Sequence, residues 1–461
     1  MASSSNGSIT LPIVSLQHDF QTVISDVQDG VVPEEDIWMS CYKTGEPSVH
    51  GKVRVSLGEK GEGGSRKVEL KSRDGVLLEK ATRGQYTASC SSLAVPPTII
   101  RLPKHVVRDS GGNLKTNQIT ALSVSPDLTQ IAIGHADGVI RRLPLNLDSS
   151  HHQNPAISPL TYSPHLSDTA ISSLRYFPSS RVLLSAGADF SLHILDCEPT
   201  LSTPSKPART LKGHIRAITS TAIISRGRNV LSCAKDGTVR LWDVSSGSQI
   251  RVMGSQKYSS VNAMSLGERG DNWIPPSANR DDAETPKALQ PDPREVDTLD
   301  KLVFLALQDG NFECIDLGSK TSAFYSSSAP NYQRHGALNA ISYFQRSSLL
   351  AIGSLSGVVA VYDTRSLASP LCSFQRNSAS IEDLAFVSGS DDADNEKNST
   401  EAALAIATED GLPFVAGIRP NGPEVRAELA GGGNCDAVRL VAVDERGGLW
   451  VACDDGIVRM Y

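Results

Sequence analysis

The sequence contains no run of apolar residues near the ~18 needed to cross a bilayer, and residues 1–10 lack the basic-then-apolar order of a signal peptide. Its eight cysteines include no Cys-x-x-Cys pair, which argues against a zinc site and favours a reducing compartment. Aromatic residues make up only 5 % of the chain, with no basic stripe among them, and the net charge is −7. We therefore expect no membrane, metal or nucleic-acid binding.

Signatures of catalysis are missing as well. There is no His-Glu-x-x-His motif and no repeated carboxylate pair, and the adjacent His151 and His152 lie in a polar linker. The glycine cluster at 58–65 does not match a phosphate-binding loop, because no Gly-Lys-Ser/Thr opens a helix there. We expect a non-enzyme that uses no cofactor and no small-molecule substrate.

What the chain does contain is short β-rich runs joined by glycine turns. Residues 229–234 and 238–244 are rich in Val, Leu, Thr and Trp, and a Lys-Asp-Gly turn centred on Asp236 separates them. Asp-Gly between two such runs is a strong hairpin signal, because both residues tolerate positive φ. A third candidate strand, 217–224, is preceded by Gly-His. With the Leu-Trp-Asp that ends the hairpin, the stretch resembles a WD repeat, one blade of a β-propeller.

The hairpin signature recurs along the chain. Successive turns lie 45 to 54 residues apart, except for 73 residues between the third and fourth, where an insertion lies. The turns centre on Asp137, Asp189, Asp236, Asp309, Ser356, Asp410 and Asp455. Because a single blade cannot bury both of its faces, we predict one ring that contains all seven.

The fold class we predict is all-β: a seven-bladed WD-repeat β-propeller preceded by a small β-rich N-terminal domain. Residues 1–10 are Ser-rich and predicted to be a disordered tail. Residues 11–95 carry short alternating runs without a blade signature, and form the predicted N-terminal domain. Residues 96–461 form the predicted propeller. The chain ends on the third strand of the last blade, so we expect residues 98–107 to supply its fourth strand and close the ring.

Two polar insertions interrupt the repeats, at 267–301 in the fourth blade and at 388–401 in the sixth. Both join the first and second strands of a blade, so we expect both on one face. Their composition predicts flexible, solvated loops, with acidic binding arms as the alternative. The opposite face would then be open to a partner.

Four residues of the third blade form a predicted hydrogen-bond network. His214 lies before the first strand and can donate to Asp236, while Ser232 can bridge His214 to the indole of Trp242. These atoms satisfy buried polar groups, so we interpret them as structural rather than as a catalytic triad. His165, Ser185 and Asp189 are similar to this set in the second blade.

A second resemblance is narrower than the fold. The run Arg-Gly-Arg-Asn-Val at 226–230, followed by Ser232 and by the hairpin to Asp243, resembles the proteasomal ATPase-associated factor family. Similar stretches are Ile-Trp-Met-Ser-Cys at 37–41 with Gly45, Pro47, Ser48 and Gly51, and Asp-Gly-Ile-Val-Arg at 455–459. The layout of domains is similar across nearly the whole chain, which departs from the family in its insertion at 267–301 and at Phe190 and Ser356.

That resemblance implies a WD-repeat assembly chaperone of the proteasome regulatory particle. Such a protein would be a monomer that binds the C-terminal domain of one regulatory-particle ATPase subunit, in the cytoplasm and also in the nucleus. We expect the open face to make the contact, with Tyr258 and Arg216 as anchors, since aromatics and Arg dominate hot spots. The candidate partner-binding residues are Asp168, Arg216, Lys235, Tyr258, Gln308, Glu382, Glu409, Asp436 and Asp454. Their acidic majority suggests a basic partner surface.

Two alternatives remain. Val-Tyr-Asp-Thr-Arg at 361–365 resembles the ending of substrate receptors of cullin-type ubiquitin ligases, in which Arg365 would face the adaptor. Ser356 replaces the acidic residue upstream in that pattern. A general WD-repeat scaffold with an unrelated partner is the third interpretation.

Overall fold

The computed structural model describes residues 8–60, 66–81, 85–108, 118–145, 147, 159–200, 203–204, 206–270, 292–328, 332–387, 402–419, 422–432 and 437–461. These residues form one α-helix, of nine residues, a few short 3-10 turns and many short strands. No helix within these ranges is long and apolar enough to cross a membrane.

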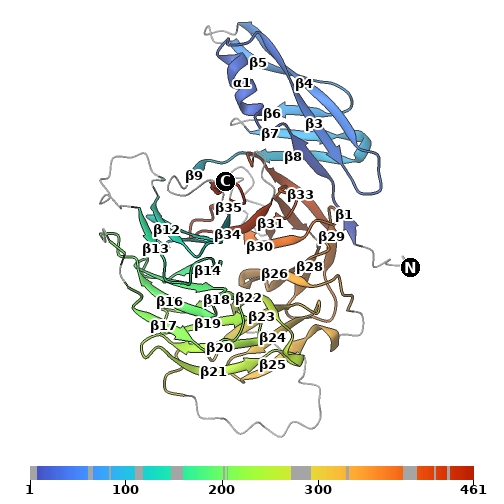
Figure 1. The fold of residues 1–461 in the computed structure, drawn as a ribbon. Coiled ribbons are helices and arrows are strands. Elements are labelled where there is room, and N and C mark those ends of the chain that lie inside the picture. The colour runs from blue at the N-terminus through green and yellow to red at the C-terminus, as the bar shows by residue number, and fades with distance from the viewer. Residues whose placement is uncertain are drawn as a thin grey trace, which may run out of the picture.

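Seven sheets stand side by side in a closed ring, with the N-terminal residues beyond one edge of it (Figure 1). Each innermost strand packs against the innermost strands of both neighbouring sheets, and the first blade contacts the seventh. The fold is therefore the seven-bladed β-propeller that the repeats predict, with WD-type blades.

The strands of the first four blades follow one another in sequence. They are β10 (Ile119–Val124), β11 (Gln130–His135), β12 (Ile140–Pro144), β13 (Leu160–Tyr162), β14 (Ile171–Tyr176), β15 (Val182–Gly187), β16 (Ser191–Asp196), β17 (Arg209–Lys212), β18 (Ile218–Ile224), β19 (Asn229–Ala234), β20 (Thr238–Asp243), β21 (Ser248–Gly254), β22 (Val261–Glu268), β23 (Lys301–Leu307), β24 (Phe312–Asp316) and β25 (Thr321–Tyr325).

The last three blades recruit strands from the N-terminal part of the chain. Their own strands are β26 (Leu338–Phe344), β27 (Leu349–Ser354), β28 (Val358–Asp363), β29 (Cys372–Gln375), β30 (Ile381–Val387), β31 (Ala403–Thr408), β32 (Phe414–Arg419), β33 (Gly422–Leu429), β34 (Val438–Val443), β35 (Leu449–Cys453) and β36 (Ile457–Met460). The recruited strands are β1 (Ile9–Thr10), β8 (Val95–Arg101) and β9 (His105–Arg108).

Turn chemistry explains why each blade folds as predicted. Six of the seven hairpins between second and third strands carry a glycine with φ between 74° and 86°. A side chain is disfavoured there, so glycine is the residue expected. The second blade is the exception, because Phe190 adopts a φ of 68° in place of glycine.

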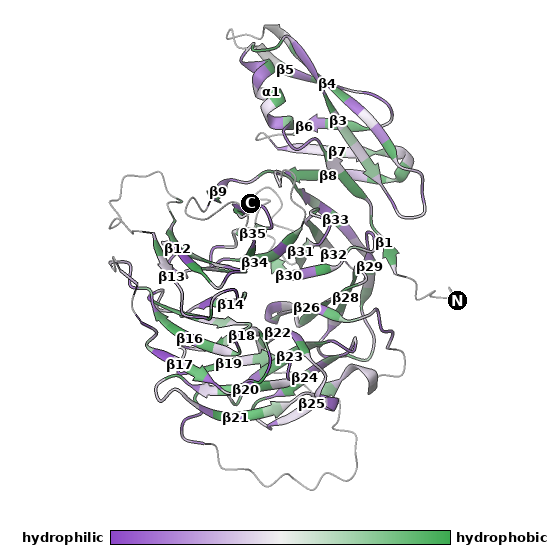
Figure 2. Ribbon diagram, in the orientation of Figure 1, coloured by the Kyte–Doolittle hydropathy of each residue, from purple (hydrophilic) through white to green (hydrophobic). Residues whose placement is uncertain are grey.

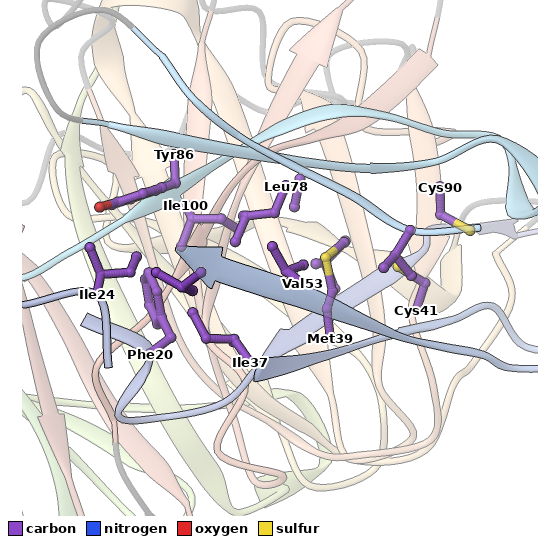
Figure 3. Close-up of a cluster of buried hydrophobic side chains, with 14 of the residues drawn as sticks. Phe20, Ile24, Ile37, Met39, Cys41, Val53, Leu78, Tyr86, Cys90 and Ile100 are labelled. Atoms are coloured by element: carbon purple, nitrogen blue, oxygen red, sulfur yellow. The ribbon is translucent and has the colours of Figure 1, made fainter. Parts of the chain in front are cut away.

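The N-terminal residues form a separate packed cluster. A sheet of β2 (Ile13–Leu16), β3 (Glu34–Tyr42), β4 (Val49–Lys60) and β5 (Arg66–Ser72) faces α1 (Phe20–Gln28) and the hairpin β6 (Leu77–Lys80) and β7 (Tyr86–Cys90). Phe20, Ile37, Met39, Leu78 and Ile100 are fully buried between these layers (Figure 3). The prediction for this region is a β-rich domain and names no helix. The helix follows from apolar residues at 20, 23, 24 and 27, which is helical spacing.

β8 belongs to both parts of the molecule. It pairs antiparallel with β7 and parallel with β33, so one seven-stranded sheet runs from the sixth blade into the N-terminal part (Figure 1). Hydrophobic residues, among them Ile99 and Ile100 of β8 and Ile9 of β1, make up part of both strands (Figure 2). Backbone pairing therefore joins the N-terminal part to the ring without a linker at this point.

The ring closes through a strand shorter than predicted. β9 pairs antiparallel with β36, with Val107 opposite Val458. Residues 98–101 do not take part, because they belong to β8 and Pro103 has no N–H with which to continue a ladder. The seventh blade thus gains its fourth strand from the part of the chain that precedes the first blade.

Two expectations for polar segments need correction. The tail at 1–10 is not disordered throughout, because Ile9 and Thr10 pair parallel with Phe374 and Gln375 of β29. The end of the insertion at 267–301 is not a free solvated loop either. Asn229 donates to the carbonyl of Arg294 over 3.0 Å and accepts from the N–H of Val296 over 2.7 Å. The rest of that insertion, 271–291, and the whole of 388–401 lie outside the described residues.

Candidate functional site: the open face of the propeller

The open face consists of the seven hairpin turns between second and third strands together with the loops that lead into each first strand. Adjacent blades touch here through backbone. The N–H of Asp168 donates to the carbonyl of Asp137 over 3.1 Å, and a Cβ at Gly237 would lie 2.6 Å from the carbonyl oxygen of Tyr258. The hairpins of the first and third blades are therefore seated against the loops that enter the second and fourth blades, and together the turns and loops form the rim of this face.

Inside the third blade, the four network residues form a complete chain of hydrogen bonds. His214 Nδ1 lies 2.9 Å from Asp236, its Nε2 lies 2.8 Å from Ser232 Oγ, and Trp242 Nε1 donates to the same oxygen over 2.9 Å. Burial lowers the pKa of His214 although Asp236 opposes the shift. A neutral imidazole fits this chain, since it donates to Asp236 and accepts from Ser232. All of these polar atoms are engaged with one another, which is a structural role.

The second blade carries a variant of the same network. His165 Nδ1 lies 2.9 Å from Asp189, and its Nε2 lies 3.0 Å from Ser185 Oγ. Leu195 stands where the third blade has its tryptophan, and His193 fills the neighbouring space with its ring 4.6 Å from that of His165.

Among the described residues, His165, Asp189 and His193 form a group compact enough to be tested as a metal site. His193 also has both ring nitrogens engaged, by Ser191 at 3.0 Å and by Thr210 at 3.1 Å. Because all four imidazole nitrogens already have hydrogen-bond partners, we assign no metal to this group.

The predicted partner-binding residues do not share one environment. Asp168, Arg216, Lys235, Tyr258, Gln308 and Glu409 are exposed on the open face, whereas Glu382 and Asp454 are half-buried. Asp436 lies outside the described residues.

Glu382 and Asp454 are both neutralised by one arginine. Arg439 donates to Glu382 over 3.0 Å and holds Asp454 by a bidentate contact, with its closest approach at 2.8 Å. The two carboxylates raise the pKa of Arg439. The negative charge of the open face at the sixth and seventh blades is therefore smaller than the sequence suggests, because two of the carboxylates there are already paired with Arg439.

Lys235 and Gln308 are likewise joined through a residue that sequence reasoning missed. Lys235 Nζ lies 3.2 Å from Asn262 Oδ1, and the Asn262 amide donates to Gln308 over 3.0 Å and to the carbonyl of Leu338 over 2.9 Å. Asn262 and Arg439 occupy the same place in their blades, at the bulge near the start of the innermost strand. Residues at this bulge position therefore join neighbouring blades near the centre of the ring. Identifying the position from the sequence would have required an alignment of the blades with one another.

Sequence reasoning also missed the exposed apolar residues of this face. Leu166 is 68 % exposed, Ile215 74 %, Phe190 42 % and Leu355 46 %, beside Tyr258 at 74 %. Leu166 and Ile215 each follow the network histidine of their blade. Their N–H groups donate over 3.2 Å to Asp189 and Asp236 respectively, which fixes both side chains outward. The sequence feature that could have identified these residues was the presence of an apolar residue within an otherwise polar turn.

A central channel of about 690 Å³ runs between the innermost strands of all seven blades. Arg175 and Asp383 line it from opposite blades of the ring. Enclosure by protein raises the pKa of Asp383 to about 6 and lowers that of Arg175. The charges of these two side chains are complementary.

Comparison with known proteins identifies the repeats. The family model for the WD domain, G-beta repeat, matches residues 158–196 and 205–243, which contain the first three strands of the second and third blades. THO complex subunit 6 of Homo sapiens is 33 % identical over 97 residues, which cover 21 % of this chain and 27 % of that protein. THO complex subunit 6 of Arabidopsis thaliana is 27 % identical over 135 residues, covering 28 % and 33 %.

The chain thus carries WD repeats, and its matches span no more than a third of the length of these relatives. The relatives bear the name of a THO complex subunit. Nothing in these comparisons supports the proteasomal chaperone that the sequence led us to expect.

Proposed function

We propose that this WD-repeat chain is a non-catalytic adaptor that holds a folded protein partner on its open face. The observation that carries the proposal is a difference in exposure between the side chains beneath the rim of that face and those on the rim. The polar groups beneath the rim are engaged with one another, whereas Leu166, Ile215 and Tyr258 on the rim are largely exposed. A rigid disc with exposed apolar and charged loops can bind a surface, and among the residues that the structure describes no group is arranged as a catalytic site.

For the partner, we propose the C-terminal domain of a regulatory-particle ATPase subunit, with the protein acting as an assembly chaperone. The support is residue-based. In the motif at 226–230, Arg228 donates to Asp243 over 2.9 Å, and Asn229 holds the insertion that follows β22. In the motif at 37–51, a Cβ at Gly51 would lie 2.4 Å from Val76. Two of the three stretches that carry the resemblance therefore have specific structural roles here.

A second candidate is membership of an assembly like the THO complex, which the names of the relatives favour. The alignment to those relatives is confined to a short stretch, so it supports shared repeats more strongly than a shared assembly. The second candidate function predicts a nuclear location, and the first predicts a cytoplasmic one.

The ligase-receptor alternative is less well supported than either. Arg365 folds back onto Asp363, with donor–acceptor distances of 2.6 and 2.8 Å, and its side chain is 59 % exposed. An adaptor would have to compete with this local ion pair.

The experiment is affinity capture of the tagged full-length protein at moderate salt, followed by mass spectrometry and by fractionation of nucleus and cytoplasm. We expect regulatory-particle ATPase subunits without core-particle subunits. Recovery of THO-type subunits from the nucleus would instead select the second candidate. Recovery of a cullin adaptor that depends on Arg365 would overturn both.

A further inference from the structure

Phe190 occupies a place that every other blade gives to glycine. Its φ of 68° lies in the left-handed region, which is unfavourable for an aromatic residue, and its side chain is 42 % exposed. No aromatic ring of the described residues packs against it. Strain of this kind persists where the surrounding structure enforces it, and it occurs preferentially at binding sites.

Three further exposed apolar side chains lie in the loops that enter the second, third and fourth blades. Leu166 is tied by its N–H to Asp189, the residue before Phe190. In the third blade, the hairpin glycine Gly237 lies against the loop of Tyr258. By the same repeat geometry, Phe190 stands beside the loop that enters the third blade and carries Ile215. Leu166, Phe190, Ile215 and Tyr258 together are called the apolar sector below.

The charges around the apolar sector are mainly positive. Arg216 follows Ile215, Lys257 precedes Tyr258, and Lys235 projects from the hairpin between them, all three exposed. Asp168 is the exposed acidic residue beside Leu166, whereas Asp189 and Asp236 are turned inward to their histidines. The acidic residues Glu409 and Asp455 lie in the sixth and seventh blades, away from this sector.

We propose that the apolar sector is the principal docking surface of the open face, and that it takes an amphipathic segment with apolar side chains flanked by acidic residues. Exposed aromatic and aliphatic anchors ringed by cations fit such a segment both in hydrophobicity and in charge. This reverses the expectation from sequence, in which an acidic face meets a basic partner. The inference deepens the proposed function, because it assigns the contact to blades two to four and gives the partner's chemistry.

The test uses the full-length protein and a random twelve-residue peptide library displayed on phage. We expect selection of peptides that combine Leu, Ile or Phe with Asp or Glu. Binding of a selected synthetic peptide should weaken about tenfold or more in Ile215→Asp and in Lys235→Glu/Lys257→Glu. Val252→Asp, at an exposed position on the outer strand β21, is the matched control and should bind as the wild type does.

Phe190→Gly separates binding from folding. Because glycine tolerates positive φ and the lost side chain is only partly buried, this variant should keep the Tm of the wild type or raise it by about 1 °C. It should nevertheless bind the peptide several-fold more weakly. A purely structural Phe190 would give no loss of binding on this substitution.

Selection of basic peptides, or of peptides that bind Ile215→Asp and the wild type equally, would overturn the proposal. The result is independent of affinity capture from cells. Acidic apolar peptides specific for this sector, together with no ATPase or THO-type partner in cells, would leave the surface assignment standing and remove the proposed function.

Discussion

Arg376 and Glu428 form a buried ion pair at the point where the N-terminal residues meet the fifth and sixth blades. The guanidinium makes two contacts with the carboxylate, and the side chains are only 5 % and 8 % exposed. The same two residues hold the N-terminal chain, because Glu428 accepts from the N–H of Val14 and Arg376 donates to the carbonyl of Pro12, both over 3.0 Å. Arg376 also stacks 4.2 Å from the ring of Phe414.

Arg376→Ala should therefore destabilise the protein by about 3–5 kcal/mol, because it leaves the buried carboxylate of Glu428 without its cation. The loss should appear in urea unfolding and as faster proteolysis of the N-terminal residues. Arg365→Ala removes an exposed ion pair and is the control, with an expected cost of about 0–1 kcal/mol. Equal costs for the two variants would contradict this account of the junction.

The two blade networks predict a graded effect of serine removal. Ser232→Ala leaves both the indole N–H of Trp242 and the Nε2 of His214 without a partner, so we expect a loss of about 2–4 kcal/mol. Ser185→Ala orphans one imidazole nitrogen only and should cost about half as much. Urea unfolding followed by tryptophan fluorescence measures both, and a larger loss for Ser185→Ala would contradict the assignment.

The buried histidines of the second blade predict acid sensitivity. Burial, assisted by neighbouring His165, lowers the pKa of His193 from 6.5 to about 4. Between these pH values the unfolded chain binds a proton that the folded protein does not, so the free energy of unfolding falls as the pH falls. For His193 the loss is about 2–3 kcal/mol.

His193→Gln should flatten the dependence of the free energy of unfolding on pH between about 6.5 and 4. Burial also lowers the pKa of His165, which contributes with the same sign, so a smaller slope should remain. Chemical unfolding at a series of pH values gives the two curves, with His50→Gln at an exposed strand position as the matched control. If the curves for His193→Gln and the wild type superimpose, His193 is not a source of the pH dependence of stability.

The ion pairs of Arg439 predict which acidic residues of the open face contribute to the stability of the fold. Asp454→Asn breaks a bidentate contact and should lower stability by about 1 kcal/mol. Glu409→Gln alters an exposed residue and should leave stability within about 0.5 kcal/mol. Thermal unfolding measures the stability of both variants, and a stability loss confined to Glu409→Gln would contradict this interpretation.

The repeat pattern was readable from the sequence because each blade is a local structure. A hairpin turn with glycine at positive φ and a histidine that meets an aspartate 22 or 24 residues later are short-range relationships. These relationships recur at similar intervals, so a blade whose own pattern is incomplete can still be recognised from its spacing to the others. The helix Phe20–Gln28 was equally local, and its apolar spacing was present but outweighed by the β-rich runs around it.

The candidate site was predicted only in part, since its charges depend on neighbours in other blades. Asp454 and Glu382 are 72 residues apart and meet on Arg439, which no sequence spacing indicates. The sequence shows that the turns contain apolar residues. Only the closed ring of blades shows that these residues lie on the same part of the open face.

The sequence by itself determined the number of blades, the hairpin turns and the hydrogen-bonding residues inside the second and third blades, because these follow from backbone preferences and short-range contacts. Tertiary structure alone decided that β1, β8 and β9 complete sheets of blades five to seven, where the partner strand is hundreds of residues away. It also decided which carboxylates stay unpaired and which apolar side chains share a surface. Strand edges and side-chain charges find their partners by proximity in space, and that proximity exists only once the ring has closed.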